Sequence, residues 1–527
     1  MEIQIFGGIN EIGGNKIFIN VGDKTFLFDF GLSFKDYNKF FSEFLSPRKF
    51  NGIVDYLYLK LIPPINELYR NDLILPFADT LDKKPYNIKC CETNYIDAFF
   101  LTHAHMDHYK FVSFLKKETP IYLNWISKAI LFYISTISND PLISDVLSYY
   151  ELFKTIPKMS KKNNLEKQYK RAKKREYDQN EIKRNIVDME IEKPYSFNSS
   201  NGTVSITQYE IDHSIPGACS YIIEHDGRSI IYTGDFRRHG FHDNWIDTFI
   251  NIARRSNPLA IITEGTKIPS KRELNDNIYS LKEQSERDVL LKSGELIKSH
   301  LGLILLNFPA RNLDRILIYY ELAKKNHRTF AITPKIFLFL QSIRSYFEKL
   351  NENEKKQFKG DYKLPETNSE NIIVYLPRRS WGKFELIDYK KFEKKIFKEK
   401  NYVTYKEVKN EPEKYLLYLD FFMLNELIDL DQKPGTVMYL NSTTDPFSEE
   451  MELQEDKLNA WLERFGIFKT ETVHSSGHCS VKDLIETLQK INADYIIPVH
   501  TENHESIKDL GFKGNIILPE YGKKYII

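Results

Sequence analysis

The chain has 527 residues, and its 42% hydrophobic and 28% charged residues are an ordinary balance for a globular protein of two or three domains. The net charge is +1, so it indicates no partner, and any nucleic-acid surface must be local. Four scattered cysteines argue against a disulfide framework or a cysteine-rich zinc site. No apolar run reaches the roughly 18 residues of a membrane span, and the first residues lack a signal-peptide pattern, so we expect a cytoplasmic protein without membrane contact.

Strand patterns dominate the first half of the chain. They cover residues 2–6, 16–21, 25–30, 95–102, 203–212, 218–225 and 228–233. The second half adds helix patterns at 280–299, 312–325, 453–465 and 481–492, between strand patterns at 260–263, 301–308, 329–333, 436–440, 468–473 and 495–499. This alternation predicts an α/β protein with a parallel sheet covered by helices.

A dense group of ligand-type side chains follows the predicted strand at 95–102. The sequence of residues 101–108 is Leu-Thr-His-Ala-His-Met-Asp-His. Alternate residues of an extended loop project to one side, so His103 and His105 can face one metal ion while Asp107 and His108 face another. Imidazole nitrogens and carboxylate oxygens suit zinc. One histidine pair is commonly structural, but four such residues within six favour a metal site.

Three further ligand-type residues end other predicted strands, namely His213, Asp235 and His500. Taken singly, each also fits an ordinary core or surface residue. Together with the 103–108 cluster they favour a set of ligands on one sheet edge. A carboxylate such as Asp235 can bridge two cations about 3.5–4 Å apart.

This pattern resembles the metallo-β-lactamase superfamily, whose signature is H-x-H-x-D-H followed by a histidine, a bridging aspartate and a last histidine. The resemblance implies an αββα sandwich. It also implies two zinc ions, which manganese can replace, held by His103, His105, Asp107, His108, His213, Asp235 and His500. Asp29, within Leu-Phe-Asp-Phe-Gly at 27–31, matches the family's first motif and would support the metal loop from behind the ligands.

The long separation of Asp235 from His500 leaves room for an inserted domain, which resembles the β-CASP domain of nucleic-acid-processing members. Glu264, His478 and His500 match its motifs residue by residue. The expected division is a metallo-β-lactamase domain at 1–265, an α/β β-CASP domain at 266–469, and a return to the first domain at 470–527. In the family, the RNA-processing branch tends to carry histidine where His500 stands, and the DNA-processing branch valine.

Within this group the chain is most similar to ribonuclease J, through residues 7–15, 31–34, 212–216, 309–312 with Arg315, 474–478 and 498–502. The resemblance implies hydrolysis of single-stranded RNA to 5′-phosphate products, as a 5′-3′ exonuclease, an endonuclease or both. Two zinc ions would activate the attacking water, which Asp107 would orient. Glu264 is the acidic motif residue, and His478 would protonate the departing 3′ oxygen.

The loop before the predicted helix at 481–492 is a candidate phosphate site, because N–H groups and the helix dipole at a helix N-terminus attract anions. The residues expected to bind RNA phosphate are His474, Ser475, Ser476 and Gly477. They predict a preference for RNA with a 5′-monophosphate. The serines also fit helix capping, and for Ser480, with Asp483 three residues later, capping is the expected role.

Two features depart from ribonuclease J. Few residues follow His500, so the family's C-terminal domain is expected to be absent, and the oligomeric state stays open. Residues 158–193 carry twelve Lys or Arg against seven Asp or Glu, with almost no apolar face. That stretch is expected to be a solvated or protein-docking excursion, with a guide for RNA phosphates as the alternative.

Other functions stay open on the sequence alone. A DNA exonuclease or repair nuclease can use the same fold. A small-molecule hydrolase is a second alternative, against which the long insertion argues. A non-catalytic RNA-processing subunit is the third, although such subunits commonly lose ligands and this sequence carries the whole set.

Overall fold

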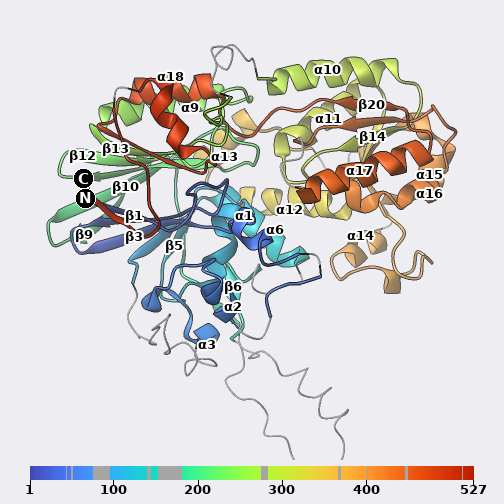
Figure 1. Cartoon of the computed structure of the whole chain (residues 1–527). Helices are drawn as coiled ribbons and strands as arrows, with labels where there is room; N and C mark the ends of the chain where they lie inside the picture. The colour runs from blue at the N-terminus through green and yellow to red at the C-terminus, as the bar shows by residue number, and fades with distance from the viewer. Residues whose placement is uncertain are drawn as a thin grey trace, which may run out of the picture.

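The computed structural model describes residues 1–42, 44–48, 52–74, 95–138, 144–151, 181–273, 283–365, 370–399, 401–444, 449–512 and 514–527. Their strands form three seven-stranded sheets and one two-stranded sheet. Two of the large sheets stack on each other, and the third lies beside this sandwich (Figure 1).

The first sheet holds both ends of the chain. Its strand order is β23-β1-β2-β3-β4-β5-β8. The bounds are β1 Glu2–Ile5, β2 Lys16–Val21, β3 Lys24–Phe30, β4 Ala98–Phe100, β5 Ile121–Leu123, β8 Ile186–Asp188 and β23 Lys524–Ile526. Because β1 pairs antiparallel with β23, the two termini lie side by side (Figure 1).

The second sheet gathers four strand ends at one edge. Its order is β22-β21-β13-β12-β11-β10-β9. The bounds are β9 Tyr195–Ser199, β10 Gly202–Glu210, β11 Cys219–His225, β12 Arg228–Tyr232, β13 Pro258–Glu264, β21 Tyr495–Val499 and β22 Asn515–Ile516. β12, β13 and β21 are parallel, and β10 runs with β12 because both pair antiparallel with β11. The carboxyl ends of these four strands therefore meet at the same edge.

The two sheets pack through apolar inner faces. Phe28 and Phe100 of the first sheet meet Tyr221 of the second, with ring centroids 5.3 and 5.6 Å apart. Helices α9 (Asp243–Arg255) and α18 (Val481–Ile491) cover the outer face of the second sheet. Helix α6 (Trp125–Ile137) packs on the first sheet's side. This arrangement is helix, sheet, sheet, helix, which confirms the predicted αββα sandwich.

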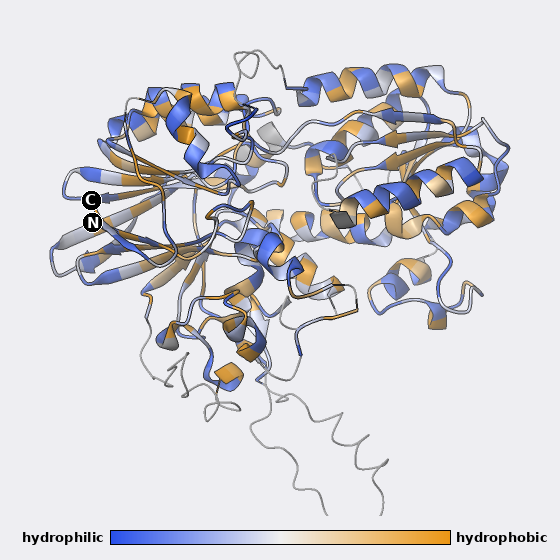
Figure 2. Ribbon diagram, in the orientation of Figure 1, coloured by the Kyte–Doolittle hydropathy of each residue, from blue (hydrophilic) through white to orange (hydrophobic). Residues whose placement is uncertain are grey.

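The third sheet is wholly parallel. Its order is β17-β16-β15-β18-β14-β19-β20. The strands are β14 Ile304–Asn307, β15 Thr329–Ile332, β16 Ile372–Tyr375, β17 Tyr402–Val403, β18 Tyr415–Tyr418, β19 Met438–Asn441 and β20 Lys469–Thr472, and the long helices beside them are α10 Glu286–Ser299, α11 Leu313–Lys325, α12 Pro334–Phe347 and α17 Glu449–Arg464. These helices show alternating hydrophilic and hydrophobic bands (Figure 2).

The third sheet is inserted between two neighbouring strands of the second. The chain leaves after β13 and returns at β21, yet Glu264 of β13 still pairs with Val499 of β21. The domain boundaries at 265/266 and 469/470 stay a prediction, and the second of them falls within β20.

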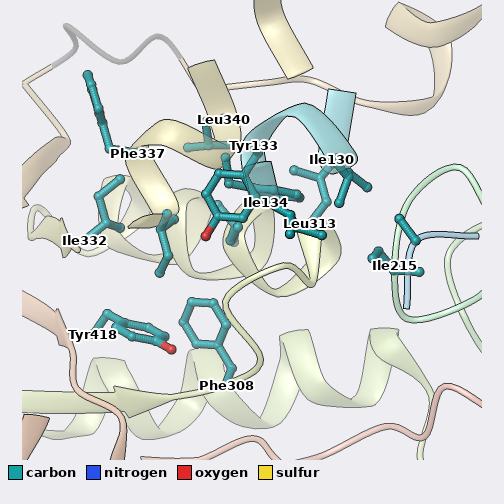
Figure 3. Packing of buried hydrophobic residues seen from close by; sticks show 14 of the residues in the cluster. Ile130, Tyr133, Ile134, Ile215, Phe308, Leu313, Ile332, Phe337, Leu340 and Tyr418 are labelled. Carbon is teal, nitrogen blue, oxygen red and sulfur yellow. The ribbon is translucent and has the colours of Figure 1, made fainter. Parts of the chain in front are cut away.

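The sandwich and the insertion share a continuous apolar core. Helix α6 packs against α12, and Figure 3 shows Tyr133 and Ile134 near Leu340. The ring of Trp125 also meets that of Phe358 at 4.9 Å. The α12 helix starts where the sequence favours it, because Thr333 caps its N-terminus and Pro334 is its first residue.

The other described elements are short. They are α1 Phe34–Asn38, α2 Val54–Tyr58, α3 Asn71–Ile74, α5 Met106–Tyr109, α13 Glu352–Asp361, α14 Glu393–Glu399, α15 Tyr405–Asn410, α16 Glu426–Leu430, β6 Ser148–Tyr149 and β7 Ile182–Lys183, with 3₁₀ segments at Asn66–Leu68, Lys110–Phe114, Leu386–Asp388, Pro412–Lys414, Phe421–Met423 and His504–Leu510. Within the described ranges, no helix has both the length and the hydropathy needed to cross a membrane.

The structure describes only the second part of the predicted excursion at 158–193. Residues 158–180 lie outside the described residues. Residues 181–193 belong to the fold, since β7 pairs with β6 and β8 pairs with β5. Arg184 is buried there and donates hydrogen bonds to the carbonyl oxygens of Asp145, Leu115 and Ser113. A buried guanidinium with three such partners fixes this part of the stretch in place.

Candidate metal centre

The 103–108 loop begins directly after β4, where the sequence predicts it. His103 and His105 precede α5, which contains Asp107 and His108. Gly31 lies directly against the backbone of this loop, because a Cβ built on Gly31 would meet the carbonyl oxygen of Asp107 at 1.5 Å. A glycine is therefore required at position 31 by the close approach of the two segments.

One group of possible ligand atoms is made of three histidines. His105 Nδ1 lies 3.1 Å from His103 Nε2 and 3.2 Å from His213 Nε2. Burial lowers the pKa of His103 and His213 well below the usual value, and lowers that of His105 to about 3. The three imidazoles are thus neutral at physiological pH, and a neutral imidazole offers a lone pair to a cation.

A second group combines two carboxylates and two histidines. Asp235 Oδ2 lies 3.1 Å from His108 Nε2 and 3.2 Å from His500 Nε2, while Asp107 Oδ2 lies 3.3 Å from His500 Nε2. Burial alone would raise the pKa of both carboxylates, but the neighbouring histidines hold them well below their usual values. Both carboxylates are therefore ionised and available as ligands.

Asp235 joins the two groups. Its Oδ2 is also 3.8 Å from His103 Nε2, and its Oδ1 is buried without any hydrogen-bond partner. An unpartnered buried carboxylate oxygen is costly unless a cation or a donor meets it. The donor set and this unpartnered oxygen are compatible with the binding of divalent metal ions.

Asp29 forms hydrogen bonds to the start of the 102–108 segment and to His108, which is the supporting position that the family motif implies. It is the extra residue of a bulge in β3, where Lys16 pairs with Phe30 and Ile17 with Phe28, and its φ is 54°. Asp29 accepts hydrogen bonds from Thr102 N at 2.9 Å and Tyr232 Oη at 2.7 Å.

The same carboxylate orients one ligand. Asp29 Oδ2 lies 2.7 Å from His108 Nδ1. Burial would lower the pKa of His108, but Asp235 and Asp29 raise it well above the usual value. With Nδ1 turned to Asp29, the other ring nitrogen, Nε2, faces Asp107 and Asp235.

A third group surrounds Glu264, at the end of β13. Glu264 Oε2 lies 3.0 Å from His478 Nδ1 and accepts a hydrogen bond from Thr266 Oγ1 at 2.7 Å. Thr266 Oγ1 also lies 2.9 Å from His500 Nδ1. Burial would lower the pKa of His478, but the Glu264 carboxylate raises it to about 9, so His478 carries a proton at neutral pH.

The 474–477 loop lies against these groups, and at Gly477 it approaches them so closely that a side chain would not fit. His213 Nδ1 is 2.6 Å from the Gly477 carbonyl oxygen, and a Cβ on Gly477 would meet Ser214 Oγ at 2.6 Å. The Oγ of Ser475 is buried without a partner. Ser480 caps α18, accepting a hydrogen bond from Asp483 N at 3.0 Å, which confirms the predicted cap.

A buried ion network holds this loop to the insertion, and sequence reasoning missed it. Arg237 is paired with Asp212 at 2.6 Å, Glu286 at 2.6 Å and Asp314 at 2.7 Å. The carbonyl oxygen of Ser476 also accepts a hydrogen bond from Arg237, at 3.3 Å.

A second arginine extends the same network. Arg315 pairs with Glu286 at 3.2 Å and donates to the carbonyl oxygen of Ser475 at 3.3 Å. Arg315 stands in a motif that the sequence indicated, whereas nothing in the local sequence distinguishes Arg237 from its partly buried neighbour Arg238. Thr266 was missed for the same reason, since only its position between Glu264 and His500 gives it a role.

The chain is similar to several known proteins. Residues 468–510 match the family described as a Zn-dependent metallo-hydrolase RNA specificity domain. The chain is 27% identical to Endoribonuclease YSH1 of Mycosarcoma maydis over 171 residues, 31% of this chain and 15% of that protein. It is 21% identical to Ribonuclease J of Mycoplasma pneumoniae (strain ATCC 29342 / M129 / Subtype 1) over 95% of this chain and 68% of that protein.

One solved structure shares the fold over the full length. The crystal structure of a protein of unknown function from Enterococcus faecalis V583 has a TM-score of 0.66 and 18% sequence identity, and the match covers 100% of this chain and 99% of that one. At this identity the likeness bears on the fold alone. The coverage of the two curated relatives is uneven, because the chain spans only 15% of the first and 68% of the second.

Proposed function

We propose that the chain is a nuclease of the metallo-β-lactamase fold with an inserted β-CASP domain, and that it is a metal-dependent ribonuclease that hydrolyses single-stranded RNA. The observation that carries the proposal is Asp235, a buried carboxylate that lies between two groups of ligand atoms and has one oxygen without a partner. The RNA specificity family match at 468–510 covers the loop beside it.

The proposed cofactors are two zinc ions, which manganese can replace. One ion would be held by His103, His105 and His213, the other by Asp107, His108 and His500, with Asp235 shared. When bound, such ions supply Lewis-acid chemistry, lowering the pKa of water and neutralising charge on phosphate oxygens. Asp107, whose side chain is 15% exposed, would orient the attacking water from the open side.

His478 is the proposed proton donor to the departing 3′ oxygen. Its side chain is 23% exposed, and the Glu264 carboxylate keeps it protonated. Protonation of the 3′ oxygen leaves a 3′-hydroxyl on one product and a 5′-phosphate on the other. Thr266 positions His478 and His500 together, because its hydroxyl lies within 3.1 Å of a ring nitrogen of each.

The 474–477 loop is the proposed phosphate site and favours RNA with a 5′-monophosphate. The carbonyl oxygens of Ser475, Ser476 and Gly477 are bonded to buried arginines and histidines, so fewer of them are free to repel an anion. Ser475 and Ser476 add hydroxyl donors, and α18 adds the positive end of its dipole. His474 is oriented by its Nδ1, which lies 3.1 Å from the Ser442 carbonyl oxygen.

One experiment tests this function. Matched end-labelled RNA and DNA strands with 5′-monophosphate, 5′-hydroxyl and capped ends are incubated with the purified chain, with and without a chelator. We expect chelator-sensitive cleavage of RNA, fastest on the 5′-monophosphate strand, with 5′-phosphate products. Faster cleavage of DNA would assign the protein to DNA processing instead, and equal rates on all RNA ends would leave the loop as a clamp on internal phosphates. The label position separates exonuclease from endonuclease products.

A further inference from the structure

A cavity opens beside the metal centre at the carboxyl edge of the third sheet. It has a volume of about 460 Å³, and His105 forms part of its wall. Most of its other walls come from the last residues of β14, β18 and β19, from the residues that follow these strands, and from helix α17. The volume falls within the roughly 300–1,000 Å³ of small-molecule sites, so the cavity has room for a nucleoside.

The wall that follows β18 is aromatic. Phe421 and Phe422 begin a short 3₁₀ helix there, and their rings meet edge to face at 5.5 Å. Phe422 is 80% exposed, whereas Met423 next to it is buried. An exposed phenyl ring in the wall of this cavity offers a flat face for stacking, and every nucleobase has such a face.

The last residues of β14 and β19 are asparagines, and hydrogen bonds hold their side-chain amides in place. Asn307 Nδ2 donates a hydrogen bond to Asn441 Oδ1 at 2.9 Å, and Thr443 Oγ1 donates to the same oxygen at 3.0 Å. Each side-chain amide carries a donor and an acceptor, which is the kind of group that reads the edge of an unpaired base.

The charges in the cavity are separated in a way that orients a nucleotide. Arg311 lies on the side of the metal loop, because its Nη1 is 3.5 Å from the carbonyl oxygen of Ala104. Asp420, which precedes Phe421 in the chain, and Glu455 of α17 also line the cavity. A phosphate is therefore attracted toward Arg311 and repelled from the carboxylates Asp420 and Glu455.

We propose that this cavity is a base-binding subsite, which stacks the base of a nucleotide adjoining the cleaved phosphodiester bond on Phe422 and holds its edge at Asn307 and Asn441. The inference rests on the proposed function, because it places the phosphate of the same nucleotide at the metal centre. Stacking on a phenyl ring is tolerant of base identity, so the subsite selects for an unpaired base rather than for one sequence.

The test compares Phe422→Ala with the matched control Phe468→Ala. Phe468 is 72% exposed just before β20 of the same sheet and does not line the cavity. Loss of one stacking contact should lower kcat/KM on single-stranded RNA by about 5- to 150-fold in Phe422→Ala, while Phe468→Ala keeps the full value. Both side chains are exposed, so neither substitution disturbs the core.

A substrate series identifies the stacked base. In the unsubstituted protein, one abasic nucleotide beside the cleaved bond should cost the same factor as Phe422→Ala, and this abasic substrate should suffer no further loss in the variant. Equal kcat/KM of Phe422→Ala and the unsubstituted protein on all substrates would overturn the subsite. The subsite would also be overturned if the losses of kcat/KM from Phe422→Ala and from an abasic nucleotide multiplied at every position of that nucleotide.

A binding measurement separates this inference from the proposed function. A single-stranded oligonucleotide that carries a fluorescent base, 2-aminopurine, at the identified position is titrated with the chain in chelator, where no hydrolysis is needed. Quenching that Phe422→Ala abolishes and Phe468→Ala retains supports the subsite even if no RNA is cleaved. Cleavage of RNA with quenching that is the same in both variants overturns the subsite and leaves the nuclease intact.

Discussion

The metal centre and the neighbouring cavity share His105, yet they are built in different ways. At the candidate metal centre the proposed ligands are mostly buried, and several are held by a second residue, as His108 is by Asp29 and His213 by Gly477. The cavity instead presents half-buried amides and the exposed ring of Phe422. Ligands must sit in nearly fixed positions around an ion, whereas stacking tolerates small displacements of the base.

The two regions also come from different parts of the chain. The proposed ligands lie at strand ends of the sandwich, in which β13 and β21 pair with each other although the insertion separates them in the sequence. The cavity belongs to the inserted parallel sheet, and the buried network of Arg237 and Arg315 joins the two at Glu286. If this contrast is right, changes at the first region should abolish chemistry, changes in the network should cost stability, and changes outside both should alter affinity alone.

The largest of the three effects is expected at the proton donor. His478→Ala should lower the rate on ordinary RNA by about 10²–10⁴-fold, the usual cost of losing a positioned acid. A sulfur leaving group needs little protonation, so RNA with a 3′-bridging sulfur at the cleaved bond should be cut by the variant at nearly the normal rate. Single-turnover rates on the two substrates make the comparison, and His504→Ala is the control. Equal impairment on both substrates would mean that His478 binds phosphate instead.

Breaking the buried ion network of Arg237 should lower the free energy of unfolding. Arg237→Met leaves Asp212 and Asp314 without this buried partner and leaves Glu286 with Arg315 alone. Removing one member of a buried ion network costs about 3–5 kcal/mol. Arg238→Met is the matched control. Arg238 is 15% exposed, but its ion-pair partner among the described residues is the 60% exposed Asp247, so loss of that pair should cost less than about 1 kcal/mol. Urea unfolding of the two variants measures the difference. Similar midpoints for both would show that the network contributes little to the fold.

The smallest effect concerns the basic stretch. Within 158–180, nine Lys or Arg stand against three Asp or Glu, and residues from 181 on must be kept because they belong to the sheet. If three or four of these cations contact RNA phosphates, deleting 158–180 should flatten the plot of log affinity against log salt by roughly 2–3, with turnover at saturating RNA unchanged. The alternative expectation, a solvated or protein-docking excursion, predicts an unchanged slope. Affinity measured across a salt series decides between the two.

The sandwich was predictable because its signals are local. The predicted strand at 16–21 is β2, the strand at 218–225 is close to β11, and the helix at 481–492 is α18 with its Ser480 cap. The ligand residues stand at strand ends in a dense, ordered pattern, so the sequence alone indicated that they would meet.

Long-range partners could not be predicted in the same way. Arg237 finds Asp314 and Glu286 only after the insertion has folded back onto the sandwich, and the sequence around Arg237 resembles that around any surface arginine. The bounds of the insertion's strands were also less certain, because a buried apolar run such as 301–308 is consistent with strand or helix, and only Ile304–Asn307 forms β14. The side chains of the cavity carry no motif, since stacking and amide contacts can be made by many residue combinations.

The metal content of the chain and of one variant tests the central claim most directly. Elemental analysis of the purified protein should find about two zinc or manganese ions per chain, lost together with RNA hydrolysis on treatment with a chelator. Asp235→Asn should bind far less metal and lose turnover while still unfolding cooperatively, whereas Glu505→Gln, at an exposed carboxylate paired with Lys271, should keep both ions and full activity. A metal-free protein that cleaves RNA in the presence of chelator would contradict the account.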